Sequence, residues 1–139
     1  MSLKKFSNDR YLKIAFLIGG IYDIVFGLPM LILPNLVVTI LNIAKPEPII
    51  QLQTIGAFLI FVGYLLLMAS QDGRRLAFIG VGSAVKRLGY VILVVLAWLT
   101  IGIDLGYILV AITDTLIAII ILVPIALTEG ISWKNLWQI

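Results

Sequence analysis

Hydrophobic residues run through this chain in four long, almost unbroken stretches that short polar segments separate. The stretches cover residues 11–33, 52–70, 76–100 and 105–127. Each has about the 20 apolar residues that a helix needs to cross a bilayer, and none alternates over about ten residues as a membrane β-strand does. The pattern predicts an all-α polytopic membrane protein, with four transmembrane helices in one compact bundle that forms a single domain over residues 1–139.

The segment between the first two stretches is too short to cross the membrane. It holds the apolar run Leu36–Ile43, which is followed by Lys45–Pro48, a polar and proline-rich sequence. We expect the run to form a short helix at the membrane interface, supported by the bundle or by lipid, because helices under about 12 residues are marginal alone. The alternative is that this segment covers a pocket between the spans.

Composition excludes a water-soluble globular protein. Of the 139 residues, 62% are hydrophobic and 12% are charged, and the mean hydropathy is +1.16, whereas a soluble domain is about 45–50% apolar and about 25% charged. Cysteine and histidine are both absent, which excludes disulfides, the usual zinc sites and histidine ligation of haem. We therefore expect no cofactor and no bound metal.

Lysine and arginine distribute unevenly between the two sides of the predicted bundle. One side carries only Lys45, and the other carries seven basic residues: Lys4, Lys5, Arg10, Lys13, Arg74, Arg75 and Lys134. Because cytoplasmic loops carry the basic excess, we expect a protein of the cell inner membrane with both termini cytoplasmic and with Trp133 and Trp137 as interfacial anchors. The net charge of +3 then reports topology rather than a nucleic-acid partner. The first stretch is too long for a signal peptide and lacks a small-residue cleavage site, so we expect it to be retained.

Four charged residues fall inside the predicted spans: Asp23, Lys86, Arg87 and Asp114. At 1.5 Å per residue they lie about 14–16 Å deep, near the middle of a core about 30 Å thick. Each charge at that depth costs about 2.5–3.5 kcal/mol, so we expect Asp114 to pair with Lys86 or Arg87 and Asp23 to pair with the other cation. The network either fixes how the helices pack or forms a functional polar site, and both interpretations stay open.

Small and polar residues accompany these charges. Gly19 and Gly27 share a helix face with Asp23, and Gly82 and Gly89 share one with Lys86. Small residues let membrane helices approach closely, and the alternative is that they leave room for a ligand. Further polar groups are Tyr107 and Thr113 near Asp114, and the remaining ligand- or ion-binding candidates are Tyr22, Gln53, Tyr64 and Tyr90.

A set of motifs extends over most of the chain. They are Gly-Gly-Ile-Tyr-Asp at 19–23, Gly-Leu-Pro at 27–29, Gly63-Tyr64, the midplane Lys86 after Gly80 and Gly82, and Asp114. In these features the chain resembles the DoxX-like group of small bacterial four-helix membrane proteins. The resemblance implies a four-helix bundle, and some members of that group are associated with respiratory or sulfur-redox complexes. It assigns no catalytic residue to this chain.

Three classes of function remain for such a bundle. Catalysis is the least favoured, because paired aspartates are poor acids near neutral pH and the sequence holds no recognisable nucleophile–base set. A proton- or ion-coupled transporter would need an oligomer, since four helices are few for a pathway. We favour binding of membrane lipid or another hydrophobic ligand, or a role as accessory subunit, either as a homo-oligomer or in a larger membrane complex.

Overall fold

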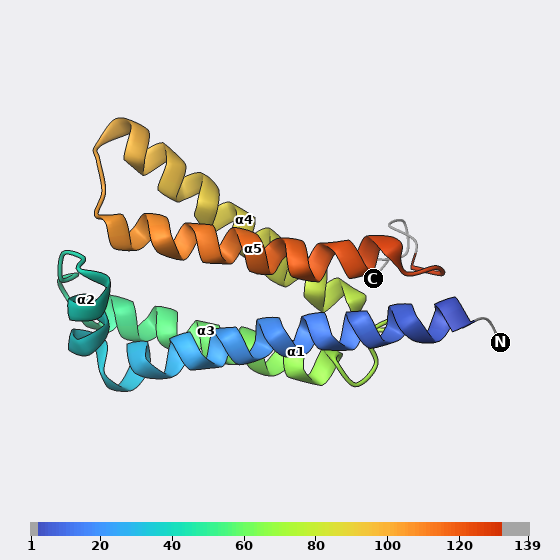
Figure 1. The fold of residues 1–139 in the computed structure, drawn as a ribbon. Coiled ribbons are helices and arrows are strands. Elements are labelled where there is room, and N and C mark those ends of the chain that lie inside the picture. Colours follow the sequence, from blue (N-terminus) through green and yellow to red (C-terminus); the bar gives the residue numbers. More distant parts are fainter. Residues whose placement is uncertain (1–2, 132–139) are drawn as a thin grey trace.

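A computed structural model describes residues 3–131 of the chain, with side chains from Asp9 onward. Its elements are α1 (Leu3–Ile32), α2 (Pro34–Leu41), α3 (Ile50–Ala69), α4 (Ala77–Thr100) and α5 (Leu105–Leu127), and the described residues contain no strand (Figure 1). The predicted anchors Trp133 and Trp137, and Lys134 between them, lie outside the described residues.

The predicted fold class is confirmed. Within the described residues, four helical segments are long and apolar enough to cross a membrane: Asp9–Ile32, Ile50–Ala69, Ala77–Thr100 and Leu105–Leu127. The expected short helix between the first two spans also exists, as α2. It begins at Pro34, whose missing N–H is no loss in a first helical turn. It ends at Leu41, and the C-cap residue Asn42 adopts the left-handed conformation with φ 49°.

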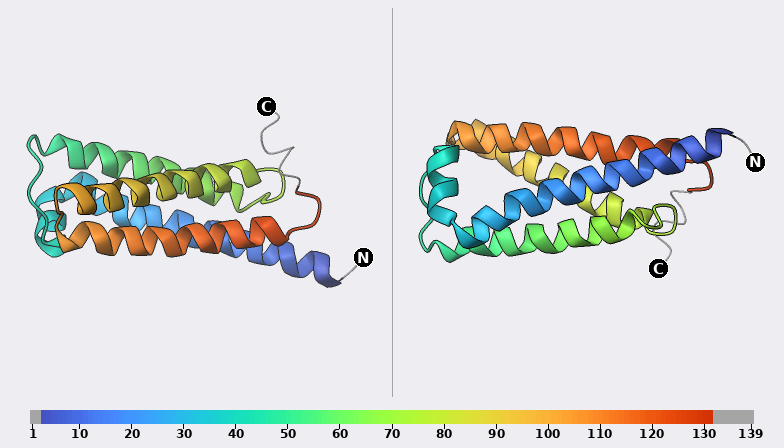
Figure 2. Two further views of the ribbon diagram at one scale, coloured as in Figure 1. Left: turned by 90° about the horizontal axis from the view of Figure 1, so that it is seen from above. Right: turned by 60° about the horizontal axis from the view of Figure 1, so that its bottom comes forward.

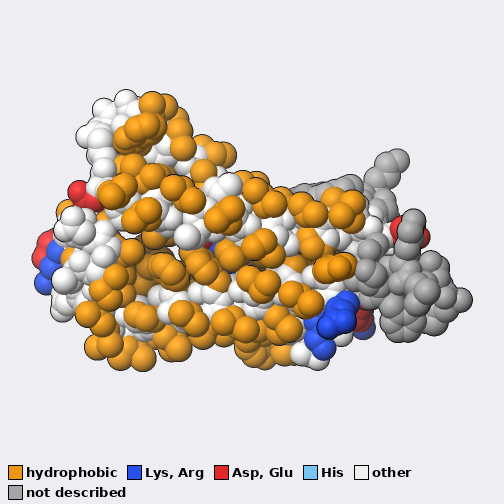
Figure 3. All heavy atoms as spheres, viewed as in Figure 1, with side chains coloured by type: hydrophobic (Ala, Val, Ile, Leu, Met, Phe, Trp, Pro, Cys, Tyr) orange, Lys and Arg blue, Asp and Glu red, His pale blue; other side chains and the backbone are white. Residues whose placement is uncertain are grey.

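The four long helices run lengthwise, and α2 lies across one end of them (Figures 1 and 2). We call this end, which also holds Lys45 and the α4–α5 connection, the α2 end. The opposite end carries Arg10, Lys13, Arg74 and Arg75 and is called the basic end. Figure 3 shows a broad hydrophobic surface between the two ends, with Lys and Arg side chains at its rim.

Arg74 joins three parts of the chain at the basic end. Its Nε donates to Asp9 Oδ1 of α1 at 2.5 Å, and its Nη1 donates to the carbonyl oxygen of Glu129, just beyond α5, at 2.7 Å. The half of the bundle nearer this end also holds the larger hydrophobic core. Its buried members include Leu12, Phe16 and Leu66, and further members are Ala69, Val81, Ile117, Ile121 and Ile125.

Helices α1 and α3 make the most extensive contact in the bundle, because glycines face each other across it. A Cβ atom on Gly20 would lie 2.9 Å from the carbonyl oxygen of Gly63, and one on Gly27 would lie 2.7 Å from that of Gly56. Real Cβ atoms do not approach other atoms so closely. Close helix packing, the expected role of these small residues, is therefore confirmed in this interface.

The same expectation is wrong for two glycines of α4. A Cβ atom added to Gly82 or Gly89 would meet nothing within 4 Å, so neither glycine brings a neighbouring helix close. Helix α4 stays near α5 but contacts α3 over only a short stretch. It lies beside α3 near the basic end and diverges from α3 toward the α2 end (Figures 1 and 2).

Candidate functional site

The four charged residues inside the helices meet in one cluster. Arg87, on α4, donates from Nη2 to Asp23 Oδ1 of α1 at 2.7 Å and from Nη1 to Asp114 Oδ1 of α5 at 2.5 Å. Lys86 Nζ lies 3.4 Å from each carboxylate oxygen of Asp23. The expected pairing of Asp114 with one cation and of Asp23 with the other is confirmed. Arg87 in addition bridges both carboxylates, which the sequence did not predict.

Helix geometry separates the two cations. Consecutive residues on an α-helix point about 100° apart, so Lys86 and Arg87 cannot both face the bundle axis. The side chains of Arg87 and Asp23 are fully buried, whereas those of Asp114 and Lys86 are 13% and 22% exposed. Arg87 is therefore the centre of the cluster, and Lys86 and Asp114 lie at its edge.

Tyr22 supports Arg87 from α1. The Arg87 Cζ atom lies 5.1 Å from the centre of the Tyr22 ring, a distance at which a cation is attracted to an aromatic face. The Tyr22 hydroxyl lies 2.7 Å from Thr113 Oγ1. Because Thr113 Oγ1 donates its own hydrogen to the carbonyl oxygen of Val110, Tyr22 is the donor in this bond. The tyrosine thus connects α1 to α5 while its ring covers the guanidinium.

A cavity of about 260 Å³ lies beside this cluster, toward the α2 end. Its walls are mostly apolar, and its polar residues gather where α4 and α5 carry their charges. The apolar wall residues are Phe26, Met30, Leu41, Ile43, Leu52, Ile55, Phe58, Leu59 and Val110. The polar ones are Tyr22, Lys86, Tyr90, Tyr107 and Asp114. We call this space the amphipathic cavity.

The polar side of the amphipathic cavity has unused hydrogen-bonding capacity. Among the described residues, neither Asp114 Oδ2 nor the Tyr90 hydroxyl has a hydrogen-bond partner. The Lys86 ammonium has three donors, and its contacts to Asp23 are long, at 3.4 Å. The lining of the cavity therefore includes a free acceptor and an incompletely used donor.

The segment containing α2 covers the cavity at one end of the molecule. Leu41 and Ile43 both line the cavity, and the Ala44 N–H donates to Asp104 Oδ2, just before α5, at 2.8 Å. Gly106 allows the Leu41 carbonyl to pack against α5, where any Cβ atom would collide with it. This arrangement agrees with the alternative that the segment covers a pocket.

The structure brings Tyr22 and Tyr90 to the charge cluster and its cavity but places two other candidates elsewhere. Tyr64 is 55% exposed on the outer surface of α3. Gln53 donates to the carbonyl oxygen of Leu31 at 3.1 Å, where it joins α3 to α1. Neither residue lines the cavity.

Two aromatic residues of the cavity wall were not among the candidates. Phe26 stacks on Tyr22 with ring centres 5.0 Å apart, and its position four residues after Tyr22 marks it as sharing a helix face. Phe58 lies on α3, a helix that is apolar on all sides. No pattern in the sequence distinguishes its cavity-facing side from its lipid-facing side.

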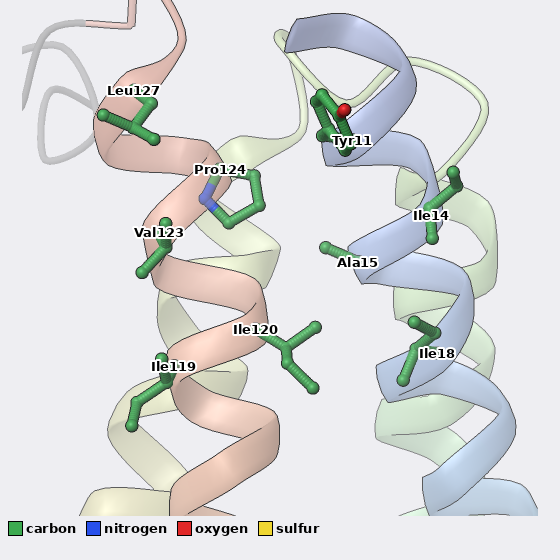
Figure 4. A pocket seen from close by; sticks show the side chains of 9 residues that line it. All are labelled: Tyr11, Ile14, Ala15, Ile18, Ile119, Ile120, Val123, Pro124 and Leu127. Atoms are coloured by element: carbon green, nitrogen blue, oxygen red, sulfur yellow. The ribbon is translucent and has the colours of Figure 1, made fainter. Parts of the chain in front are cut away.

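A second hollow of about 470 Å³ lies between α1 and α5, in the half nearer the basic end (Figure 4). Side chains such as Ile14, Ile18 and Ile120 face it across the two helices. No Lys, Arg, Asp or Glu of the described part of the chain lines it, so its described walls suit hydrocarbon and present no charged group. The amphipathic cavity is therefore the candidate site.

The candidate site offers ionic and hydrogen-bonding groups beside apolar walls. Across the described residues no group of three or more His, Cys, Asp or Glu is placed to hold a metal ion. The two carboxylates are both engaged by Arg87, which fixes their orientation. Comparison with protein-family models, with curated proteins and with solved structures found no match to the chain, so the resemblance to the DoxX-like group stays a prediction.

Proposed function

We propose that this chain is an integral membrane protein that binds a lipid or another hydrophobic molecule in the amphipathic cavity. The observation that carries the proposal is the lining of that cavity, which combines apolar walls with Lys86 and Asp114 at one side. Ligand pockets are typically apolar with a few polar groups that fix orientation. Structural ion pairs alone need no cavity beside them.

The divergence of α4 from α3 supports a route for such a ligand. Ile55 and Phe58 of α3 and Tyr90 of α4 line the cavity, and the two helices contact each other only over a short stretch. A molecule dissolved in the bilayer then enters between α3 and α4 without crossing water.

We further propose that the basic end faces the cytoplasm and that the membrane is the bacterial inner membrane. Arg10, Lys13, Arg74 and Arg75 lie at this end, while Lys45 lies at the other, and cytoplasmic loops are those with the basic excess. The amphipathic cavity then opens into the outer leaflet, and α2 covers it from the outer surface.

Lipid analysis of the purified protein tests the proposal. Val110→Phe adds an aromatic ring to the cavity wall, and Val85→Phe adds the same ring at a lipid-facing position that is 56% exposed. We expect mass spectrometry to find a retained lipid or other hydrophobic molecule with the wild type and with Val85→Phe, and its loss with Val110→Phe at unchanged thermal stability. Equal retention by all three proteins would contradict the proposal.

A second candidate function is proton- or ion-coupled transport by an oligomer. It is supported by the ionisable Lys86 and Asp114, which border the cavity instead of being sealed in the cluster. The two functions separate in liposomes that contain the purified protein. Transport requires a flux that Asp23→Asn or Asp114→Asn abolishes, whereas a binding protein gives no flux.

Binding can also be the task of an accessory subunit in a larger membrane complex. Purification from native membranes under mild detergent tests this role. Stoichiometric partners that co-purify with the wild type support it, and recovery of the chain alone contradicts it.

A further inference from the structure

We propose that the amphipathic cavity selects an uncharged amphiphile, a single apolar chain that ends in a hydroxyl group, over chains that end in a carboxylate or an ammonium group. This inference rests on the proposed binding function and names the chemistry of the ligand. It follows from three properties of the cavity: its charge balance, its free hydrogen-bonding groups and its size.

The charge cluster is already balanced. Asp23 and Asp114 contribute two negative charges, Lys86 and Arg87 contribute two positive ones, and three ion pairs connect them: Lys86–Asp23, Arg87–Asp23 and Arg87–Asp114. Of the charged residues that the structure describes, only Lys86 and Asp114 line the cavity, one of each sign. A charged ligand would leave one unbalanced charge near the middle of the membrane. At the insertion cost of such a charge, its affinity falls by about 100-fold relative to a neutral ligand of the same length.

The free polar groups favour a head that both donates and accepts. Among the residues that the structure describes, Asp114 Oδ2 has no donor, and the Lys86 ammonium keeps donors beyond its 3.4 Å contacts to Asp23. A hydroxyl group is one donor and two acceptor sites in a single small unit, so it can pair with either residue. A pure hydrocarbon would cover these groups without pairing them, which carries the penalty of an unsatisfied polar group.

The size of the cavity limits the ligand to one chain. The volume of about 260 Å³ lies below the range of about 300–1,000 Å³ that is typical of pockets for drug-sized ligands. The head group and the first part of one chain fill this space, and a longer chain extends between α3 and α4 into the bilayer. Affinity should therefore rise with chain length until the cavity is full and change little beyond that length.

Native mass spectrometry of the purified protein provides the test. The protein is mixed with equal concentrations of dodecanol, dodecanoate and dodecylamine at neutral pH, where the carboxylate and the amine are both ionised. We expect the dodecanol complex to exceed each of the other two by about 100-fold. A charged probe that competes equally with dodecanol overturns the inference.

Two charge variants make the test independent of small structural changes. Lys86→Gln gives the cluster a net charge of −1, and Asp114→Asn gives it a net charge of +1, because each removes one of the four charges. We expect Lys86→Gln to prefer dodecylamine and Asp114→Asn to prefer dodecanoate. An order of preference that is the same in the wild type and in both variants overturns the inference, since charge balance then selects nothing.

The outcomes also separate this inference from the proposed function. If all three probes bind equally and Val110→Phe abolishes their binding while Val85→Phe does not, the cavity binds hydrophobic molecules but does not select by charge. The inference then fails and the proposed function stands. If no probe binds, or if Val110→Phe and Val85→Phe bind as the wild type does, both fail.

Discussion

Helix α3 packs closely along α1 but has only a short contact with α4. Toward α1, Gly63 and Gly56 of α3 meet Gly20 and Gly27, and each pair leaves no room for a methyl group. Toward α4, the contact is short, and the space beside it forms the amphipathic cavity. Without a hydrophobic driving force between helices in lipid, association depends on packing and on polar contacts. The α1–α3 pair depends on packing.

The side of the bundle that holds α4 depends on polar contacts. Arg87 reaches from α4 to carboxylates on α1 and α5, so one buried side chain connects three helices at the depth where packing to α3 is lost. An ion-pair cluster thus borders the open cavity on the side where α4 and α3 have little contact.

The largest loss of stability is expected when Arg87, the centre of this cluster, is replaced. Arg87→Met leaves Asp23 fully buried with only the distant Lys86, and leaves Asp114 without its partner. Removing one partner of a buried ion pair typically costs about 3–5 kcal/mol, and we expect a loss of that size in the free energy of unfolding, measured by denaturant titration in detergent micelles.

Lys86→Met is the matched control for this prediction. The Lys86 side chain is 22% exposed and only 3.4 Å contacts join it to Asp23, so its loss should destabilise the protein by less than half as much. An equal loss of unfolding free energy in both variants would mean that the two cations stabilise the cluster equally and that Arg87 is not its centre.

The next largest change in stability is expected in the α1–α3 interface. Gly20→Ala and Gly27→Ala place a methyl group against the carbonyl oxygens of α3, and overpacking of this kind costs about 1–3 kcal/mol. Gly82→Ala and Gly89→Ala meet open space on α4, and there the helix preference of alanine adds up to about 1 kcal/mol of stability. In thermal unfolding, the two α1 variants should therefore be less stable than the wild type, and the two α4 variants should be at least as stable. A loss of stability in the α4 variants would contradict the openness of that side.

The sequence predicts the spans well because length and apolarity alone define them. It also predicts that Asp23, Lys86, Arg87 and Asp114 meet, since midplane charges must find partners. It does not distinguish Gly27, which packs against α3, from Gly82, which faces open space. Both lie near a buried charge on an apolar helix, and only the angle between helices determines which glycine meets a neighbour.

The same limit explains the cavity wall. In a soluble helix the polar face reveals the buried one, but in lipid both faces are apolar. Tyr64 and Tyr90 are equal candidates in the sequence, yet Tyr64 is 55% exposed on the outside of α3 and Tyr90 lines the cavity. The crossing of α4 over the bundle makes this difference, and it depends on contacts among residues far apart in the chain.

A smaller effect is expected at the bridge between α1 and α5. Tyr22→Phe keeps the ring beside Arg87 but removes the hydroxyl that donates to Thr113 at 2.7 Å. A hydrogen bond of this kind contributes about 1 kcal/mol, and we expect that loss in the free energy of unfolding. Tyr64→Phe is the control, since its exposed hydroxyl has no partner among the described residues. Equal stability of both variants would show that α1 and α5 do not depend on this bridge.

The smallest effect on stability is expected at the α2 end, where it also tests the route of the ligand. Asp104→Ala removes the acceptor of the exposed Ala44 N–H, at a cost of about 0.5 kcal/mol, while Asp104→Asn keeps an acceptor oxygen. Hydrogen–deuterium exchange of residues 42–49 should be faster in the alanine variant alone. If the ligand leaves between α3 and α4, its dissociation rate stays at the wild-type value in both variants. Faster dissociation from Asp104→Ala would instead indicate that the ligand leaves past residues 42–49, because the variant loosens only this part of the cavity wall.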